Sequence, residues 1–160
     1  MTTTVVVGNP KPRSRTYEAA VLVAERLTGT PPDRVIDVVD LGPGLLGWGD
    51  EAVAEAVAAV CASSLVVVAS PTYKATYTGL LKLFLDQIPT DGMAGVHAVP
   101  VMLGAGPGHA MAPELLLKPV LVELGATCPT RGLYLLDSAW SDATVLDPWV
   151  ERAGAQLGGP

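Results

Sequence analysis

The segment TVVVGNPKPRSRT, residues 4–16, decides the fold class of this chain. It opens with a run of β-branched residues typical of a buried strand, and Gly8 ends that run. After a short loop, apolar residues recur at helical spacing from Thr16 to Leu27. A strand, a loop and a helix in immediate succession predict the first unit of an α/β protein.

The same alternation continues along the chain. Further strands are expected at residues 34–41, 64–70, 97–104 and 131–137, with a glycine-rich loop at 42–49. Further helices are expected at about 50–63, 110–124 and 147–157, and another that Thr78 or Thr76 caps and that ends at Gln87. The third strand, SLVVVAS, is almost continuously apolar, which suits a parallel strand covered on both faces. We therefore predict one α/β domain over residues 1–160, a doubly wound five-stranded parallel sheet in three α/β/α layers.

Composition excludes several classes of function. The chain of 160 residues carries ten Lys and Arg against sixteen Asp and Glu, a net charge of −6, which argues against nucleic-acid binding. No apolar run is long enough for a membrane span and the start does not look like a signal peptide, so we expect a soluble cytoplasmic protein. Cys61 and Cys128 are expected as buried thiols, and His97 and His109 have no partner at metal-ligand spacing.

The loop after the first strand holds much of the positive charge of this acidic chain. Its polar and charged members are Asn9, Lys11, Arg13, Ser14, Arg15 and Thr16. Free N–H groups at a helix start favour an anion, hydroxyls add donors, and arginine suits a phosphate. The spacing does not match a nucleoside-triphosphate P-loop. A phosphate site is the sharper interpretation, and a solvated basic loop without a ligand is the alternative.

Two more loops are expected at the same sheet edge, where ligands of doubly wound sheets bind. Residues 70–79, SPTYKATYTG, offer backbone amides and two tyrosines to a flat heterocycle, although Tyr73 and Tyr77 can also simply cover the core. Residues 103–109, LGAGPGH, let a ligand approach the backbone closely. Their glycine spacing differs from the dinucleotide fingerprint, and a structural or solvated role is the simpler interpretation of His109.

Together the segments GNPKPRSRT, SPTYKATYTGLLKLFLD and HAMAPELLLKPVLVELGA resemble the NADPH-dependent FMN reductase family of flavodoxin-like proteins. The last two are similar to FMN reductases that serve two-component monooxygenases. The resemblance covers residues 5–137 and implies a flavodoxin-like sheet of order 2-1-3-4-5. It implies that Ser14, Arg15 and Thr16 hold the FMN phosphate, with Lys11 at the place of the motif's arginine. It also implies that Pro71, Thr72, Tyr73 and Lys74 line the flavin, and that Gly104 and Ala105 border its ring.

The resemblance also implies an activity: reduced nicotinamide, NADPH or NADH, passes hydride to FMN, and reduced FMN leaves for a partner monooxygenase. Direct hydride transfer needs position and electrostatics rather than a general acid or base, so no catalytic side chain is predicted. A homodimer or homotetramer is expected, with the third and fourth helices near the interface. The alternatives are an FMN-containing reductase of quinones, azo dyes or chromate, and a flavodoxin-like electron carrier.

Overall fold

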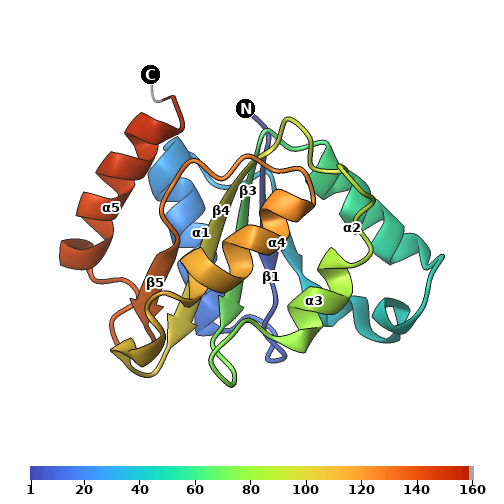
Figure 1. Ribbon diagram of the computed structural model, residues 1–160, viewed down its shortest axis with the longest axis horizontal. Helices are drawn as coiled ribbons and strands as arrows, with labels where there is room; N and C mark the ends of the chain where they lie inside the picture. The colour runs from blue at the N-terminus through green and yellow to red at the C-terminus, as the bar shows by residue number, and fades with distance from the viewer. Residues whose placement is uncertain (159–160) are drawn as a thin grey trace.

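The computed structural model describes residues 1–158, and five parallel strands form its centre (Figure 1). The order β2-β1-β3-β4-β5 confirms the predicted flavodoxin-like sheet. The strands are β1 (Thr3–Val7), β2 (Arg34–Asp37), β3 (Leu65–Pro71), β4 (His97–Gly104) and β5 (Leu133–Leu136). All neighbours are parallel, so their carboxyl ends lie along one edge of the sheet. Residues 159 and 160 of the predicted domain lie outside the described residues.

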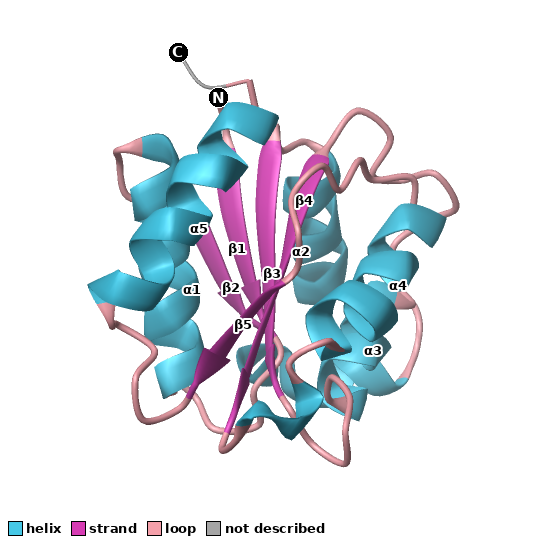
Figure 2. Ribbon diagram, turned by 60° about the vertical axis from the view of Figure 1, so that its left-hand side comes forward, coloured by secondary structure: helices cyan, strands magenta, loops and turns pink. Residues whose placement is uncertain are grey.

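Helices cover both faces of the sheet (Figure 2). The α-helices are α1 (Arg15–Thr28), α2 (Glu51–Cys61), α3 (Gly79–Leu85), α4 (Lys118–Glu123) and α5 (Ala143–Gln156). One core cluster joins alternate strand residues, such as Val5 and Val67, to α1 and α5. The other joins residues of the opposite register, such as Val6 and Val68, to α2, α3 and α4. Strands buried on both faces explain the continuous apolar runs in the sequence.

Side-chain caps begin three of the helices where the sequence indicates. The side chains of Ser14, Asp50 and Thr78 each accept a hydrogen bond from a backbone N–H in the first turn of α1, α2 and α3. Gly29 ends α1 in the left-handed conformation, which glycine adopts without a steric cost. The starts of α1 and α3 lie at the carboxyl edge, so these caps shape the loops of the candidate site.

The prediction for residues 34–49 was partly wrong. Strand β2 ends at Asp37, because its partner β1 ends at Val7, which is paired with Asp37. The chain then forms a kinked 3₁₀ segment, η1 (Val38–Leu46), where a strand end and a glycine-rich loop were expected. Gly42 makes the kink at φ 53°, and Val38 and Leu45 return to the core. The free energy gained by burying Val38 and Leu45 outweighs the preference of the glycine-rich sequence for an irregular loop.

The fourth and fifth helical predictions also need correction. The expected helix at 110–124 is preceded by a 3₁₀ turn, η2 (Pro107–His109), and includes a π-helical turn, η3 (Pro113–Leu117), before α4. The Lys118 N–H donates to the Pro113 carbonyl, five residues earlier. Pro119 has no N–H, so it cannot form the next backbone hydrogen bond of a regular α-helix. Helix α5 begins at Ala143, ahead of the predicted residue 147, because Asp142 caps it.

In the described part of the chain, no helix is both long enough and apolar enough to cross a membrane.

Candidate functional site

Three loops meet at the carboxyl edge of the sheet, and hydrogen bonds tie them together. We call residues 8–16 the first loop, residues 71–78 the second loop and residues 104–109 the third loop. The Thr78 hydroxyl donates to the Gly8 carbonyl at 2.5 Å, which joins the second loop to the first. The Thr72 N–H donates to the Leu103 carbonyl at 2.7 Å, beside the start of the third loop. The predicted residues therefore share one region of the structure.

The first loop is braced from within by Asn9. Its side-chain amide donates to the Thr16 hydroxyl at 3.0 Å, and its carbonyl oxygen accepts the Lys11 N–H at 2.9 Å. Asn9 is only 9% exposed, so these bonds are shielded from water. Because Asn9 uses both ends of its side chain, the loop is folded tightly against the start of α1.

The start of α1 leaves donors free. The backbone N–H groups of Ser14, Arg15 and Thr16 form no hydrogen bond to any residue in the described range 1–158. The Ser14 hydroxyl oxygen accepts from the Tyr17 N–H, and its own proton remains available. Unpaired amides at a helix N-terminus, together with its partial positive charge, favour an anion such as a phosphate.

The three cations of the first loop have different surroundings. Lys11 and Arg15 are exposed and form no salt bridge with a described residue, although Arg15 donates to the Asp137 carbonyl at 3.2 Å. Arg13 pairs instead with Asp37 at 2.8 Å and Asp40 at 2.7 Å. Hydrogen bonds to Asp40 and then Asp37 raise the pKa of the Arg13 guanidinium above its ordinary value. Within this structure, Lys11 and Arg15 are therefore the cations free to meet a phosphate, while Arg13 holds the loop.

Arg13 also bends the backbone. Its φ is 51°, which is unusual for a residue other than glycine. The Asp37 carboxylate accepts both the Arg13 N–H at 2.9 Å and the guanidinium, and this carboxylate is buried. The bend places Ser14 directly after it as the helix cap. Asp37 thus stabilises the geometry that leaves the helix amides open, a role the sequence did not reveal.

The second loop contains a two-residue hairpin. Tyr73 and Thr76 exchange backbone hydrogen bonds of 2.9 and 3.2 Å, and Lys74 and Ala75 between them have φ of 50° and 73°. Positive φ at both central residues is the type I′ pattern, which usually takes Asn and Gly. The Tyr73 side chain is 51% exposed, so it does not cap the core. A hairpin held in a conformation its residues disfavour is a recurrent feature of binding sites.

The second and third loops form a hollow of about 310 Å³. It is lined by Thr72, Gly104, Ala105, Gly106, Gly108, His109 and Tyr134. The Thr72 hydroxyl oxygen is buried and has no hydrogen-bond partner among the described residues. An unpaired buried hydroxyl costs free energy, so the Thr72 hydroxyl is a candidate partner for a polar group of a ligand.

Tyr134 is the site residue that sequence reasoning missed. Its hydroxyl donates to the Gly106 carbonyl at 2.7 Å and fixes the third loop. A Cβ on Gly104 would lie 2.0 Å from this hydroxyl, so the glycine is required by the tyrosine as well as by any ligand. The only local signal is a tyrosine in an expected edge strand, and nothing in the sequence brings it to Gly104.

These features fit the phosphate and the ring of FMN. The open amides of residues 14–16, the hydroxyls and the free charges of Lys11 and Arg15 suit a phosphate dianion. The hollow with the unpaired Thr72 hydroxyl suits the polar edge of a flat ring. Among residues 1–158, no cluster of three His, Cys, Asp or Glu side chains is arranged to hold a metal ion, and both cysteines are free.

The strand order and the loops at this edge define a flavodoxin-like α/β protein, a class in which FMN binds at the switch between β1 and β3. The family model of NADPH-dependent FMN reductase matches residues 1–141. The chain belongs to the NADPH-dependent FMN reductase family.

Individual relatives agree with this family. The chain is 38% identical over 73 residues to an FMN reductase (NADPH) of Escherichia coli K12, covering 46% of this chain and 38% of that protein. It is 26% identical over 152 residues to the NADH-dependent FMN reductase SfnF of Pseudomonas putida, covering 90% and 82%. The apo structure of an NADH:FMN oxidoreductase (EMOB) superposes with a TM-score of 0.84 at 31% identity, covering 98% of this chain and 86% of that one.

The similarity to the first curated relatives is local. The matched segment spans 38% of the Escherichia coli reductase and 41% of a second FMN reductase (NADPH), from Pseudomonas putida KT2440. The family model and the structural superposition establish the family and the fold of this chain. Because the curated matches are partial, the substrates and partners of this chain are proposed below.

Proposed function

We propose that this protein is a cytoplasmic NAD(P)H-dependent FMN reductase, in which reduced nicotinamide passes hydride to FMN held at the carboxyl edge of the sheet. The observation that carries the proposal is the row of amides at Ser14, Arg15 and Thr16, which have no partner among residues 1–158, beside the charges of Lys11 and Arg15, which form no salt bridge there. This arrangement suits a flavin that bears a phosphate. Membership of the FMN reductase family supports the same conclusion.

The chain's own residues would bind and orient. The first loop would hold the phosphate, and Thr72, Gly104 and Ala105 would border the ring. When bound, FMN supplies the two-electron acceptor chemistry. No acid or base is required of the protein, because hydride passes directly between stacked rings. The exposed residues Ala105, Gly108 and His109 leave one side of the hollow open for a nicotinamide.

We also propose that reduced FMN leaves this site for a partner monooxygenase. The open side of the hollow supports release, since its lining residues Ala105, Gly108 and His109 are exposed. The resemblance of the second loop and the following helix to reductases of two-component systems supports the same role. A coupled assay would measure this transfer as substrate oxidation by an added FMN-dependent monooxygenase.

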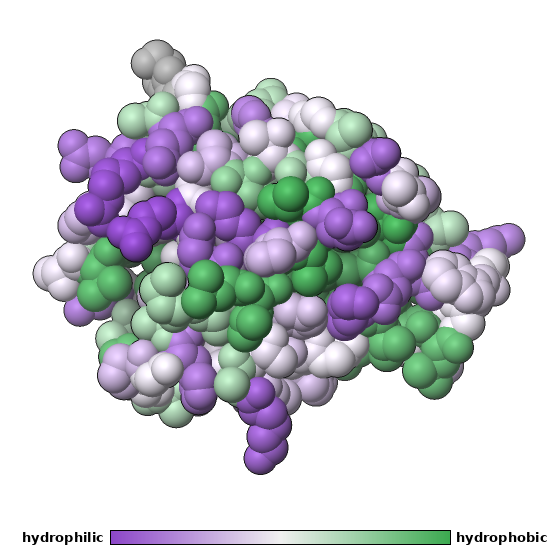
Figure 3. All heavy atoms as spheres, in the orientation of Figure 1, coloured by the Kyte–Doolittle hydropathy of each residue, from purple (hydrophilic) through white to green (hydrophobic). Residues whose placement is uncertain are grey.

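A homodimer or homotetramer is the proposed assembly. Apolar side chains gather over the α4 segment in Figure 3. Exposed apolar side chains of α3, of α4 and of the segment before α4 are Leu83, Val122, and Met111, Leu115 and Leu116, with exposures of 38–61%. A cluster of this kind is typical of an interface between chains. Light scattering is expected to give a dimer or larger, and Leu115→Glu is expected to shift it towards the monomer.

The activity is tested by steady-state oxidation of NADPH and NADH with FMN, FAD and riboflavin as acceptors. FMN is expected to have the highest kcat/KM, because it alone presents a terminal monophosphate to the first loop. Turnover of quinones without turnover of free FMN would replace this proposal with a reductase that retains its flavin. No oxidation of either nicotinamide with any acceptor would contradict reductase activity.

A further inference from the structure

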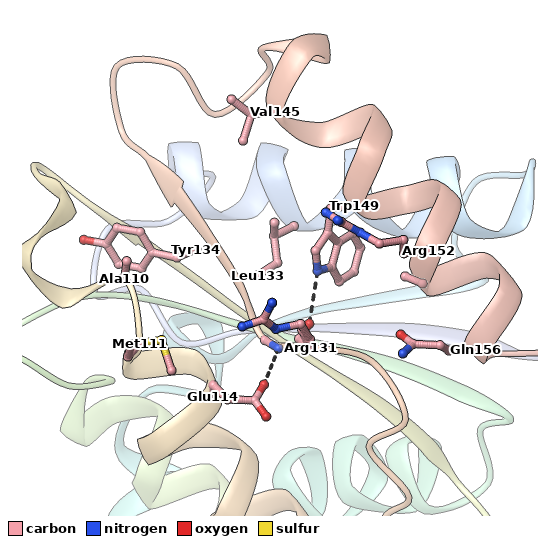
Figure 4. Close-up of a pocket in the computed structure, with 12 residues that line it drawn as sticks. Ala110, Met111, Glu114, Arg131, Leu133, Tyr134, Val145, Trp149, Arg152 and Gln156 are labelled. Carbon is pink, nitrogen blue, oxygen red and sulfur yellow. Dashed lines mark hydrogen bonds between the residues drawn. The ribbon is translucent and has the colours of Figure 1, made fainter.

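A second hollow of about 350 Å³ lies along the open edge of β5, between α5 and the segment that leads into α4 (Figure 4). Because β5 is the last strand of the sheet formed by residues 1–158, no other strand of the described chain covers this edge. The volume falls in the range of roughly 300–1,000 Å³ that is usual for small-molecule pockets. The site described above does not use this groove.

Two arginines line the groove without an ionic partner. Arg131 precedes β5 and Arg152 belongs to α5, and neither forms a salt bridge with a residue in the described range. By contrast, Arg26 and Arg34 pair with Asp147 and Glu55. In a chain with six more acidic than basic residues, two unpaired guanidiniums along one groove indicate an anionic ligand.

The one carboxylate in the groove is already engaged. Glu114 accepts from the Lys118 ammonium at 2.9 Å through one oxygen and from the Gly132 N–H at 2.6 Å through the other. Burial opposes ionisation of Glu114, but these two hydrogen bonds and the positive charges of Lys118 and Arg131 prevail and lower its pKa. Lys118 pairs directly with Glu114, whereas Arg131 acts on it without a salt bridge, so the guanidinium donors of Arg131 remain available to a ligand within the described chain.

The groove adjoins the candidate flavin site. Tyr134 lines both hollows, and its hydroxyl is bonded to the third loop at Gly106. Ala110 and Met111, which also line the groove, follow directly after His109 of the third loop. The two hollows are therefore neighbours, and a ligand that reaches past Tyr134 would have one end at the flavin site and the other between the arginines.

We propose that this groove binds the adenosine half of NADPH, with Arg131 and Arg152 on the 2′-phosphate. The proposal rests on the proposed reductase function and adds a preference for NADPH over NADH. Guanidinium groups match a phosphate with paired N–H donors. Leu133, Val145 and Met111 supply apolar surface for the nucleoside. The phosphate of a free metabolite would suit the two arginines equally well. The two arms of the experiment below distinguish such a metabolite from NADPH.

The first arm measures binding without turnover. Calorimetry follows adenosine 2′,5′-bisphosphate and AMP binding to the full chain and to Arg131→Gln, Arg152→Gln and Arg34→Gln. Each groove variant is expected to bind the bisphosphate about tenfold more weakly, the loss of one charge-assisted hydrogen bond, while AMP binding changes little. Arg34→Gln removes an arginine from β2 and is expected to match the parent. Equal affinities of parent and groove variants for the bisphosphate would overturn the proposal.

The second arm measures KM with FMN as the acceptor. In the groove variants KM for NADPH is expected to rise about tenfold, with kcat and KM for NADH unchanged. An equal rise for both nucleotides, or bisphosphate binding that depends on the arginines with KM for NADPH unchanged, would overturn the assignment to NADPH. If the parent oxidises neither nucleotide but the first arm gives the expected binding, the reductase function fails and the anion site stands.

Discussion

The first and third loops reach the same sheet edge by different physical means. The first loop is organised largely by neighbours in sequence, because Asn9 bonds to Lys11 and Thr16 and Ser14 caps α1, while Asp37 adds a brace from β2. The third loop depends on Tyr134, a residue 28 positions after the Gly106 carbonyl it holds. Local capping can be inferred from a sequence, whereas a contact between distant segments appears only when the chain is folded.

The largest expected effects are the losses of stability when a glycine of the first loop or of the third loop is replaced by alanine. A Cβ on Gly8 would lie 2.3 Å from Leu81 Cβ, and one on Gly104 would lie 2.0 Å from the Tyr134 hydroxyl. Gly8→Ala is expected to lower the free energy of unfolding by about 3 kcal/mol or more, since α3 itself must move. Gly104→Ala is expected to cost roughly 1–3 kcal/mol, because a side chain can yield. Urea denaturation measures both.

Second-site variants sharpen this contrast. Tyr134→Phe removes the atom nearest to the added methyl group, so Gly104→Ala with Tyr134→Phe is expected to be more stable than Gly104→Ala alone. Leu81→Ala keeps the Cβ that collides with Gly8→Ala and is expected to give no such relief. A Gly104→Ala loss that Tyr134→Phe leaves unchanged would disprove the control of this loop by Tyr134.

The next effect concerns the two carboxylates that hold Arg13. The Asp37 side chain is 2% exposed and accepts two hydrogen bonds from Arg13, whereas the Asp40 side chain is 50% exposed. Asp37→Ala is expected to lower the free energy of unfolding by about 1–3 kcal/mol, and Asp40→Ala by less than about 1 kcal/mol. Asp37→Ala is also expected to weaken binding of FMN more than binding of riboflavin. Equal stability losses would show that Asp37 does not shape the first loop.

Substitutions in the hairpin of the second loop are expected to make the protein more stable. Lys74→Asn with Ala75→Gly supplies the residues that a type I′ turn favours and is expected to raise stability by about 0.5–1 kcal/mol. Thermal unfolding checks this, with Ala75→Gly alone as the variant that changes only the backbone preference. Lower stability in both variants would mean that the positive φ angles are not strained.

The smallest expected effect is a pH dependence of stability from Glu114, which holds Gly132 directly before β5. The pKa of Glu114 is lowered in the folded chain, so its contribution to stability is present above its unfolded value of 4.5 and is lost as the pH falls through the folded value. Glu114→Gln is expected to flatten the acid side of the stability profile below about pH 4.5. Unfolding in urea at a series of pH values measures this. An unchanged acid side would contradict the bonds to Lys118 and Gly132.

Much of the fold could be predicted from sequence because its signals are local. Continuous apolar runs marked the buried strands, and Asp50 and Thr78 marked two helix starts. The strand after Arg34 was predicted too long because its end is set by pairing with β1, which the sequence does not display. The expected start of the last helix at 147 was too late, because Asp142 caps α5 and the helix continues through Pro148.

The candidate site also has features that the local sequence determines and features that depend on distant residues. The free amides at Ser14, Arg15 and Thr16 follow from the cap and the loop before it, so the anion site was predicted from residues 8–16. Arg13 is not free for the anion site because it pairs with Asp37 of β2, and this contact between distant residues could not be predicted from the loop sequence. The twelve predicted FMN contacts remain predictions, and the structure adds Tyr134 and Asp37 as residues that hold their loops.

The most direct test of the central claim, that the first loop binds the FMN phosphate, is the pair of dissociation constants for FMN and riboflavin in the parent and in Arg15→Ala. The parent is expected to bind FMN more tightly than riboflavin. Arg15→Ala is expected to weaken FMN binding by about 1.5–3 kcal/mol and to leave riboflavin binding unchanged. Equal affinities of the parent for FMN and riboflavin would contradict a phosphate site in this loop.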